Sequence, residues 1–529
     1  MRLDSHGAKY VGSAHWAAVL DSISELKDHY EKEEEARTQA KTQATGDLVP
    51  CHSSPGPRLL YEPVQATKAE ILASVPARPV VNRIVAAYFN TQGLAPAFLH
   101  SGQFLQEYEK FWKDPTATSL AWVGLLFSIM CLATQVQLLS HERADADLPA
   151  RFQVFRERMV QCLVLSQFTR GGPYVLETMI NHCASEVLLC KDADIGLWLL
   201  SGMVVQLALS QGYHRDPRYF SHISPFTGEM RRRVWAAIVQ LDLRLASQMG
   251  LPRVLKSQEY DTADPRNLLD ADLDESIEEL PPSRPESEVT PVLYGLAKSR
   301  IDRISALISD LLADTREHLY AEIMELDTKL REAESGLPPI FRWQPLGQSF
   351  MVPPQIVLHR VWLQLAIQRL LICLHRKYLA PSYGQDRYAY SRNTCVQAAI
   401  KMLEFQQLVN EETQPEGHLH PVRWVLSSLL QSNFLLGMSV LCYYLQRAKS
   451  MPPEDASSLD RQHTGAQIYG LLRSTYPMWL RSSTVSHDAR KAVEHLKCIA
   501  NFPTAFSADF MLESESTSSA DLLLANILD

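Results

Sequence analysis

The sequence predicts an all-α protein, a large multi-helix bundle or array whose helices are joined by disordered linkers. Between residues 68 and 503, apolar residues recur at helical spacing, with almost none of the alternation that indicates strands. The chain has 529 residues, 46% of them apolar, which is enough to bury one large helical core or two apposed ones. Stretches rich in proline, glycine or acidic residues separate the predicted helices, at Leu280–Pro291, Gly336–Pro345, Pro381–Asp386 and Met451–Asp460.

Two consecutive helices in the middle of the chain can be predicted together with their ends. The first covers Ile195–Gln211, and Gly212 follows as a left-handed terminator. The second starts after Ser224, which can cap its amino end, with Pro225 at the first helical position. Gly250 and Pro252 end this second helix, and further helices are predicted at Ile356–Tyr378, Asn393–Leu408 and Val422–Arg447.

The amino-terminal segment, residues 1–35, contains a short amphipathic stretch. Its apolar residues recur at spacings of three and four, as in a coiled-coil seam: Trp16, Val19, Ile23, Leu26 and Tyr30. Two heptads are marginal on their own, so a dimer seam and a helix docked on the main body are both open. Residues 36–67 are predicted to be a flexible linker.

Charge and cysteine usage argue against a DNA-binding module within the chain. The formal net charge is −9, and no run of five or more Lys or Arg occurs, whereas phosphate neutralisation supplies most of the affinity for nucleic acid. The nine cysteines are scattered and no two stand as C-x-x-C, so the spacing of a structural zinc site is missing. Such cysteines suit a reducing compartment.

Three long uncharged stretches raise the question of a membrane: Ser119–Ser140, Ile195–Tyr213 and Trp424–Gln446. Each contains several amides or hydroxyls. We interpret them as buried helices that are apolar nearly all round, and we expect no membrane partner.

His214-Arg215-Asp216 is similar to the catalytic loop of protein kinases, in which the aspartate orients the attacking hydroxyl. That loop needs an asparagine where this chain has Ser221, and the chain has no Asp-Phe-Gly sequence. We interpret the triplet as a loop in which the aspartate or histidine caps a backbone group.

Asp270, Asp272 and Asp274 alternate as calcium ligands do. Glu275 and Pro281, however, stand where an EF-hand loop needs glycine and glutamate. We therefore expect a solvated acidic loop.

Arg231, Arg232 and Arg233 could form a nuclear import signal or a nucleic-acid contact. They lie in an amphipathic helix, and Glu229 stands four residues before Arg233, the favourable order for an ion pair. We expect a solvated, ion-paired helix face.

Motifs of known catalytic and metal sites are absent from the sequence. It contains no H-E-x-x-H, G-x-S-x-G, G-x-G-x-x-G or G-x-x-x-x-G-K-[ST], and no activated nucleophile can be proposed. We expect no catalytic residue, no metal ligand and no cofactor in this chain.

The motifs of residues 201–274 follow one another in an ordered series. In chain order they are His214-Arg215-Asp216, Glu229-x-Arg231-Arg232-Arg233-x-Trp235, Asp242, Gly250-x-Pro252 and Asn267-x-x-Asp270-x-Asp272-Leu273. This series resembles the signature of the fungal-specific transcription factor domain, the middle homology region of the Zn(2)-Cys(6) binuclear-cluster regulators. Leu370–Arg376 is similar to a later helix of that family, and Tyr10–Tyr30 to the segment that follows its zinc cluster.

The resemblance implies an all-α regulatory domain over residues 68–503, which governs activation and partner contact. In the family a separate module, with six thiolates on two zinc ions, reads DNA. Nothing before Tyr10 supplies such a module, and Cys51 stands alone. Either the protein acts with another DNA-bound regulator, or the reading frame lacks an upstream exon; zinc is expected only in the second case.

These observations predict a nuclear regulator of transcription for a metabolic or biosynthetic gene set. We expect it to contact other regulators or coactivators and to reach DNA only indirectly or through a missing module. A homodimer through the Trp16–Tyr30 seam is one of the two alternatives left open for the amino-terminal segment. Residues 504–529 interleave acids with leucine and phenylalanine, which suits an activation segment or a last docking helix. An all-α enzyme of secondary metabolism and a helical scaffold are the alternatives.

Overall fold

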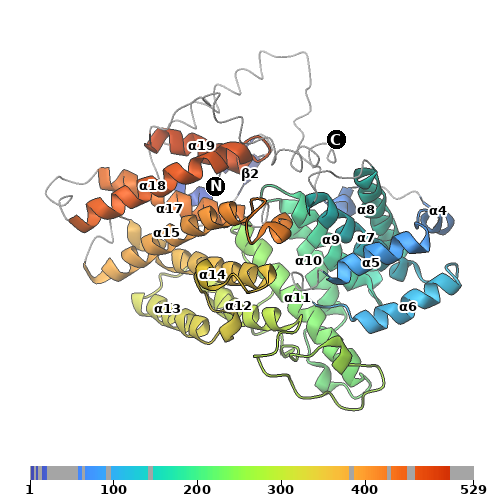
Figure 1. The fold of residues 1–529 in the computed structure, drawn as a ribbon. Helices are drawn as coiled ribbons and strands as arrows, with labels where there is room; N and C mark the ends of the chain where they lie inside the picture. Colours follow the sequence, from blue (N-terminus) through green and yellow to red (C-terminus); the bar gives the residue numbers. More distant parts are fainter. Residues whose placement is uncertain are drawn as a thin grey trace.

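The computed structural model describes residues 2–4, 7–9, 15–20, 57–61, 66–90, 97–140, 147–380, 386–425, 430–449 and 459–500. These residues form an all-α fold, which confirms the predicted class (Figure 1). Apart from a small antiparallel hairpin of β1 (Arg2–Asp4) and β2 (Gly7–Lys9), the regular elements among them are helices. The predicted tail 504–529 and most of the predicted linker lie outside the described residues, and the boundaries of the predicted domains stay a prediction.

Helices from the first half of the chain surround one large hydrophobic core. They are α3 (Arg58–Tyr61), α4 (Lys68–Ala73), α5 (Arg78–Asn90), α6 (Ser101–Lys113), α7 (Leu120–Ser140), α8 (Leu148–Leu165), α9 (Val175–Leu189), α10 (Ile195–Ser210) and α11 (Pro225–Met249), with the 3-10 turns η2 (Phe168–Arg170) and η3 (Pro217–Tyr219).

Helices from the second half, together with one from the amino terminus, surround a second core. They are α1 (Trp16–Leu20), α12 (Leu293–Ala313), α13 (Tyr320–Ser335), α14 (Pro354–His375), α15 (Ala389–Glu412), α17 (Gln431–Lys449), α18 (Leu459–Ser482) and α19 (His487–Ala500). Short 3-10 turns connect them: η5 (Pro339–Phe341), η6 (Leu346–Gln348), η7 (Arg376–Leu379), η9 (Asp386–Tyr388) and η10 (His420–Val425). Another such turn, η4 (Asp270–Asp272), lies between α11 and α12 and contacts α6.

The first core is centred on α7, a helix that is apolar on every side and contacts α5, α8 and α9. Gly124 allows α8 to lie against it, because a Cβ at this position would come within 2.9 Å of Cβ of Cys162. Burial on all sides is the reason why α7 shows no amphipathic pattern.

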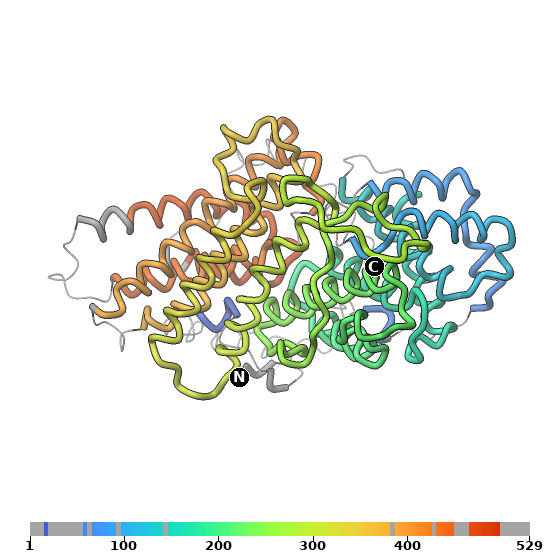
Figure 2. Tube along the Cα trace, turned by 90° about the horizontal axis from the view of Figure 1, so that it is seen from below, coloured from blue at the N-terminus to red at the C-terminus, as the bar shows by residue number. Residues whose placement is uncertain are grey.

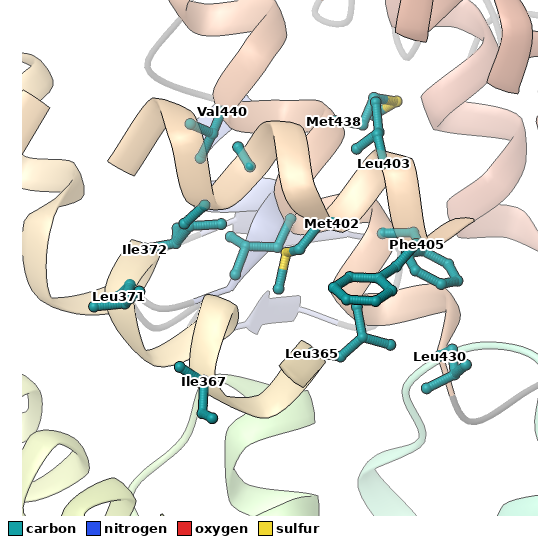
Figure 3. Packing of buried hydrophobic residues seen from close by; sticks show 14 of the residues in the cluster. Leu365, Ile367, Leu371, Ile372, Met402, Leu403, Phe405, Leu430, Met438 and Val440 are labelled. Carbon is teal, nitrogen blue, oxygen red and sulfur yellow. The ribbon is translucent and has the colours of Figure 1, made fainter. Parts of the chain in front are cut away.

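The second core is packed by apolar side chains from three neighbouring helices. Figure 3 shows Leu371 and Ile372 of α14, Met402 and Leu403 of α15 and Met438 of α17, which all belong to this core. These helices contact one another in pairs. The long apolar runs in the second half of the chain are thereby removed from water.

The two cores adjoin where α11 contacts α12. Trp424 packs against both cores, and Arg369 of α14 donates a hydrogen bond of 2.8 Å to Oγ of Ser247 on α11. Figure 2 shows this arrangement from below, with the green chain of α11 between the blue-green half and the orange-red half.

The predicted central helices are confirmed together with their ends. Helix α10 covers Ile195–Ser210, and Gly212 follows in a left-handed conformation with φ of +72°. Ser224 caps α11 by accepting a hydrogen bond from N–H of Thr227, and Pro225 is its first residue. These ends depend on residues within one helical turn, which is why the sequence predicts them.

Two later helix predictions need correction at their ends. Helix α14 ends at His375, and the chain continues to Leu379 as a 3-10 turn. The helix predicted over Val422–Arg447 starts too early, because Val422–Val425 belongs to the 3-10 turn η10 and α17 begins at Gln431. Apolar residues at short spacing do not distinguish a 3-10 turn from the first turn of an α-helix.

The start of the predicted seam lies inside the molecule. Trp16 and Ala17 are buried in the second core, and α1 contacts α17. Ile23, Leu26 and Tyr30 lie outside the described residues, so dimerisation through Trp16–Tyr30 stays a prediction.

Two of the described helical segments are long and apolar enough to cross a membrane by length and composition alone, Leu120–Ser140 and Pro354–Leu379. Most of each segment is covered by protein in the structure. The stretch Trp424–Gln446 is not one helix, because the turn η10 precedes α17.

We expect the variant Gly250→Ala to be less stable than the native chain by about 1–2 kcal/mol. Gly250 has φ of +64°, and a Cβ there would come within 2.9 Å of Cβ of His15. Urea unfolding measures the change. Gly202→Ala, in the middle of α10 with nothing near its Cβ, is the control and is expected to be neutral or slightly stabilising. Equal effects of the two substitutions would contradict the prediction.

Candidate functional site

The residues of the predicted signature lie on α11 and on the segments before and after it, residues 211–224 and 250–292. The segment after α11 contains little regular structure besides the turn η4 and lies along the lower edge of Figure 1. Backbone N–H groups without helical partners need acceptors elsewhere. The signature side chains supply several of these acceptors.

Asp216 joins three parts of the chain through one fully buried carboxylate. Its oxygens accept hydrogen bonds from Nη2 and Nε of Arg232 on α11, at 2.7 and 3.1 Å. They also accept from backbone N–H of Arg218, at 3.0 Å, and of Ala263, at 2.9 Å. The interpretation of this triplet as a capping loop is confirmed.

The charge state of Asp216 follows from these partners. Although burial opposes ionisation, hydrogen bonds from Arg232 and from the N–H groups of Ala263 and Arg218 lower the pKa of Asp216 to about 2. The other two residues of the triplet lie closer to the surface: Arg215 is exposed, and the carbonyl of His214 accepts from N–H of Asp261 at 3.1 Å.

Glu229 and Arg233 form the second group of contacts. Glu229 is fully buried and accepts from backbone N–H of Arg266 at 2.8 Å, while Nε of Arg233 lies 3.8 Å from its carboxylate. Arg233 also donates to Asp270 at 3.0 Å, and Asp270 accepts from N–H and Oγ of Ser101 at the start of α6, both at 2.8 Å. Burial raises the pKa of Glu229, and Arg233 opposes this rise.

The remaining α11 residues of the motif also face neighbouring parts of the protein. The guanidinium of Arg231 lies over the ring of Tyr213, 3.9 Å from its centroid, and donates to the carbonyl of Gln211 at 2.7 Å. This carbonyl belongs to the end of α10. Trp235 is buried and meets Tyr260 edge to face, with ring centroids 5.4 Å apart.

The prediction of a solvated arginine face is wrong. Arg233 is buried, and Arg231 and Arg232 are only partly accessible. The ion pair with Glu229 that the spacing suggested does exist, but the segment after α11 covers it. A helical pattern shows which residues share a face and does not show whether distant chain covers that face.

Asp242 holds the chain directly after α11. It is buried and accepts from the backbone N–H groups of Val254 and Leu255, both at 3.0 Å. Gly250 and Pro252 turn the chain back toward it. Burial raises the pKa of Asp242, and the two backbone hydrogen bonds oppose this rise.

The expected solvated acidic loop is also corrected. Asp272 makes two hydrogen bonds of 2.6 Å with Arg284, which together with the N–H of Leu269 lower its pKa to about 2 against a smaller effect of burial. Asp270 is paired with Arg233, so Asp274 is the exposed member of the three. Asp270 and Asp272 thus accept hydrogen bonds from arginines and from backbone N–H groups. Among the described residues, no group of three or more His, Cys, Asp or Glu could hold a metal ion.

One polar cluster was not predicted from the sequence. In the second core, Nε2 of His375 lies 3.2 Å from Oδ1 of Asp327, and its Nδ1 lies 2.9 Å from Oγ of Ser391. The order of contacts is that of a serine hydrolase triad. However, Ser391 and His375 are fully buried, and the hydroxyl of Ser391 also pairs with that of Tyr320 at 2.9 Å. The cluster joins α13, α14 and α15 and offers no hydroxyl to a substrate.

The only sequence signal for this cluster was the similarity of Leu370–Arg376 to a family helix, which contains His375. Asp327 and Ser391 lie on other helices and belong to no motif. Although burial opposes ionisation, hydrogen bonds from His375, Tyr390 and Arg331 lower the pKa of Asp327 to about 2.

The comparisons with known proteins identify this arrangement. The family model of the fungal specific transcription factor domain matches residues 86–331, which include the whole signature. The transcription factor cghF of Chaetomium globosum is 50% identical over 497 residues, which cover 94% of this chain and 88% of cghF. The chain belongs to the fungal-specific transcription factor family.

Other members of the family are similar over almost the full chain. The pyrrolocin cluster transcription factor fsdR of Fungal sp. is 43% identical, covering 100% of this chain and 69% of fsdR. The Zn(2)-C6 fungal-type transcription factor pigI of Monascus ruber is 38% identical, covering 93% of this chain and 61% of pigI. No family model for a zinc cluster matches this chain. The chain is a regulator of transcription and not an enzyme, as the sequence predicted.

Proposed function

We propose that this regulator controls one secondary-metabolite biosynthetic gene cluster, acting in the nucleus through contacts of its helical domain with other regulators or coactivators. Its similarity to cghF over 94% of the chain carries the proposal, and the name of fsdR connects that relative with a biosynthetic cluster. The contacts of the signature residues support it. These residues pair with one another and with backbone groups, and so they hold the helical domain together and form no catalytic arrangement.

Contact with DNA is the second part of the proposal. Members of the family such as pigI are named for a Zn(2)-C6 cluster, and the net charge of this chain is −9. An acidic helical body repels phosphate instead of neutralising it. We therefore assign DNA contact to a zinc cluster or to a DNA-bound partner, and zinc is needed only where such a cluster is attached.

The proposal predicts that the full chain, fused to a heterologous DNA-binding module, raises transcription of a reporter severalfold. The module alone is the control. In a matched variant, Leu522, Leu523 and Leu524 are changed to serine, which removes the apolar groups a coactivator groove would take. A lower output from this variant assigns activation to the tail, and an unchanged output assigns it to the helical body. Stable expression of the fusion without any change in reporter output would contradict the proposed function.

A further inference from the structure

A cavity of about 390 Å³ lies where the two cores adjoin. Helices α7, α9 and α11 line it from the first core, and α12, α14 and α17 from the second. Most of its wall is apolar, with Leu132 and Ile180 on one side and Leu370 and Trp362 on the other. Its volume lies within the range of pockets that hold small molecules.

The positive charges among the residues that line this cavity outnumber the negative charges. Arg233, Arg244, Lys298 and Arg369 carry positive charge, and Asp302 carries negative charge. Lys298 pairs with Asp302 at 2.6 Å. Arg233 is neutralised by Asp270 and Glu229. Arg244 and Arg369 therefore supply an excess of positive charge to an apolar cavity.

Arg244 is the more available of these two cations. Its side chain is exposed along the cavity, and it makes no hydrogen bond or ion pair with any residue that the structure describes. Because Arg244 is exposed and has no carboxylate beside it among the described residues, its guanidinium is free to pair with an anionic ligand.

Arg369 donates hydrogen bonds, but it forms no ion pair with a carboxylate in the part of the chain that the structure describes. It donates to Oγ and the carbonyl of Ser247 and to Oδ1 of Asn433, all of which are uncharged. These contacts fix its guanidinium between α11, α14 and α17. The wall thus offers two cations, Arg369 held in place by hydrogen bonds and Arg244 without such partners.

We propose that this cavity binds a small amphipathic anion, with an acidic group at Arg244 and Arg369 and an apolar body, an acyl chain or a ring system, against the leucine and tryptophan wall. The acid supplies the missing negative charge, and the apolar body fills space that water fills poorly. Because both cores line the cavity, the bound anion contacts both and stabilises the arrangement in which they adjoin. This inference concerns ligand binding and does not depend on which genes the regulator controls.

Binding can be measured on the purified full chain without DNA. Decanoate is the acyl probe and 8-anilinonaphthalene-1-sulfonate the aromatic one, and uncharged decanamide matches decanoate in length. Tryptophan fluorescence reports binding because Trp362 and Trp424 line the cavity, and the thermal midpoint gives an independent value. We expect decanoate, the sulfonate or both to bind, and an anion to bind at least about tenfold more tightly than decanamide, a difference of about 1.4 kcal/mol.

Two variants test the role of the wall. Arg244→Met keeps the length of the side chain and removes its charge, and it is expected to weaken anion binding about tenfold without changing decanamide binding. Arg83→Met, at an exposed position on α5, is the control. Ala366→Phe places a ring in the cavity and is expected to abolish binding of every probe while the helical circular dichroism stays unchanged. Failure of both anions to bind, or equal anion affinity of the native chain and Arg244→Met, would overturn the proposal; either result leaves the reporter experiment unaffected.

Discussion

The variant Arg156→Met is expected to be about 3–5 kcal/mol less stable than the native chain, because it leaves the carboxylate of Glu186 buried without its counter-charge. Both side chains lie in the first core, and Nε and Nη2 of Arg156 donate to the two carboxylate oxygens, each at 2.7 Å. His182 lies 3.6 Å from the same carboxylate. Burial lowers the pKa of His182 to about 4, so its imidazole is neutral at pH 7 in the native chain.

The double variant Arg156→Met/Glu186→Leu provides the matched control. Replacing both members of a buried ion pair by apolar residues is often nearly neutral, so the double variant is expected to recover most of the lost stability. Lys329→Met removes an exposed pair with Glu325 and is expected to cost less than about 0.5 kcal/mol. Urea unfolding at pH 7 measures all three. Equal losses in the single and the double variant would show that packing, and not the unpaired charge, decides the effect.

The second large effect is expected from Asp216→Asn, which we predict to cost about 3 kcal/mol at pH 7. Arg232 then loses the carboxylate that accepts two of its hydrogen bonds and keeps only the carboxylate of Glu229, 3.7 Å away. The effect depends on pH. The pKa of Asp216 is about 2 in the folded protein and 3.8 ordinarily, so the ionised carboxylate stabilises the fold above about pH 4. This contribution is lost as the pH falls from about 4 to about 2. The native chain should therefore lose stability over this range faster than the variant does.

Urea midpoints of both proteins at a series of pH values between 7 and 2.5 test this prediction. Glu278→Gln, an exposed substitution in the segment that covers α11, is the control and should follow the native curve. A stability difference between Asp216→Asn and the native chain that stays constant from pH 7 to pH 2.5 would count against the buried ion pair as its source.

The helical elements and the family were predictable because their signals are local. The end of α10 depends on Gly212, and the start of α11 depends on Ser224 and Pro225, all within one turn of the helix. The signature motifs are similarly short, and the family comparison confirms them. The exposure of the arginines in this signature was predicted wrongly, because Arg232 and Arg233 were expected to face water.

The sequence by itself determined which segments are helices, where several of them end, and to which family the chain belongs. The tertiary structure alone decided that Glu229 and Asp242 serve as acceptors for the backbone of a covering segment, that Asp327, His375 and Ser391 meet, and that Arg244 lines a cavity between two cores. The physical reason is the separation along the sequence of the residues that interact. Helix formation and capping depend on neighbours a few residues away, whereas burial, ion pairing and cavities depend on side chains that the fold brings together from distant parts of the chain.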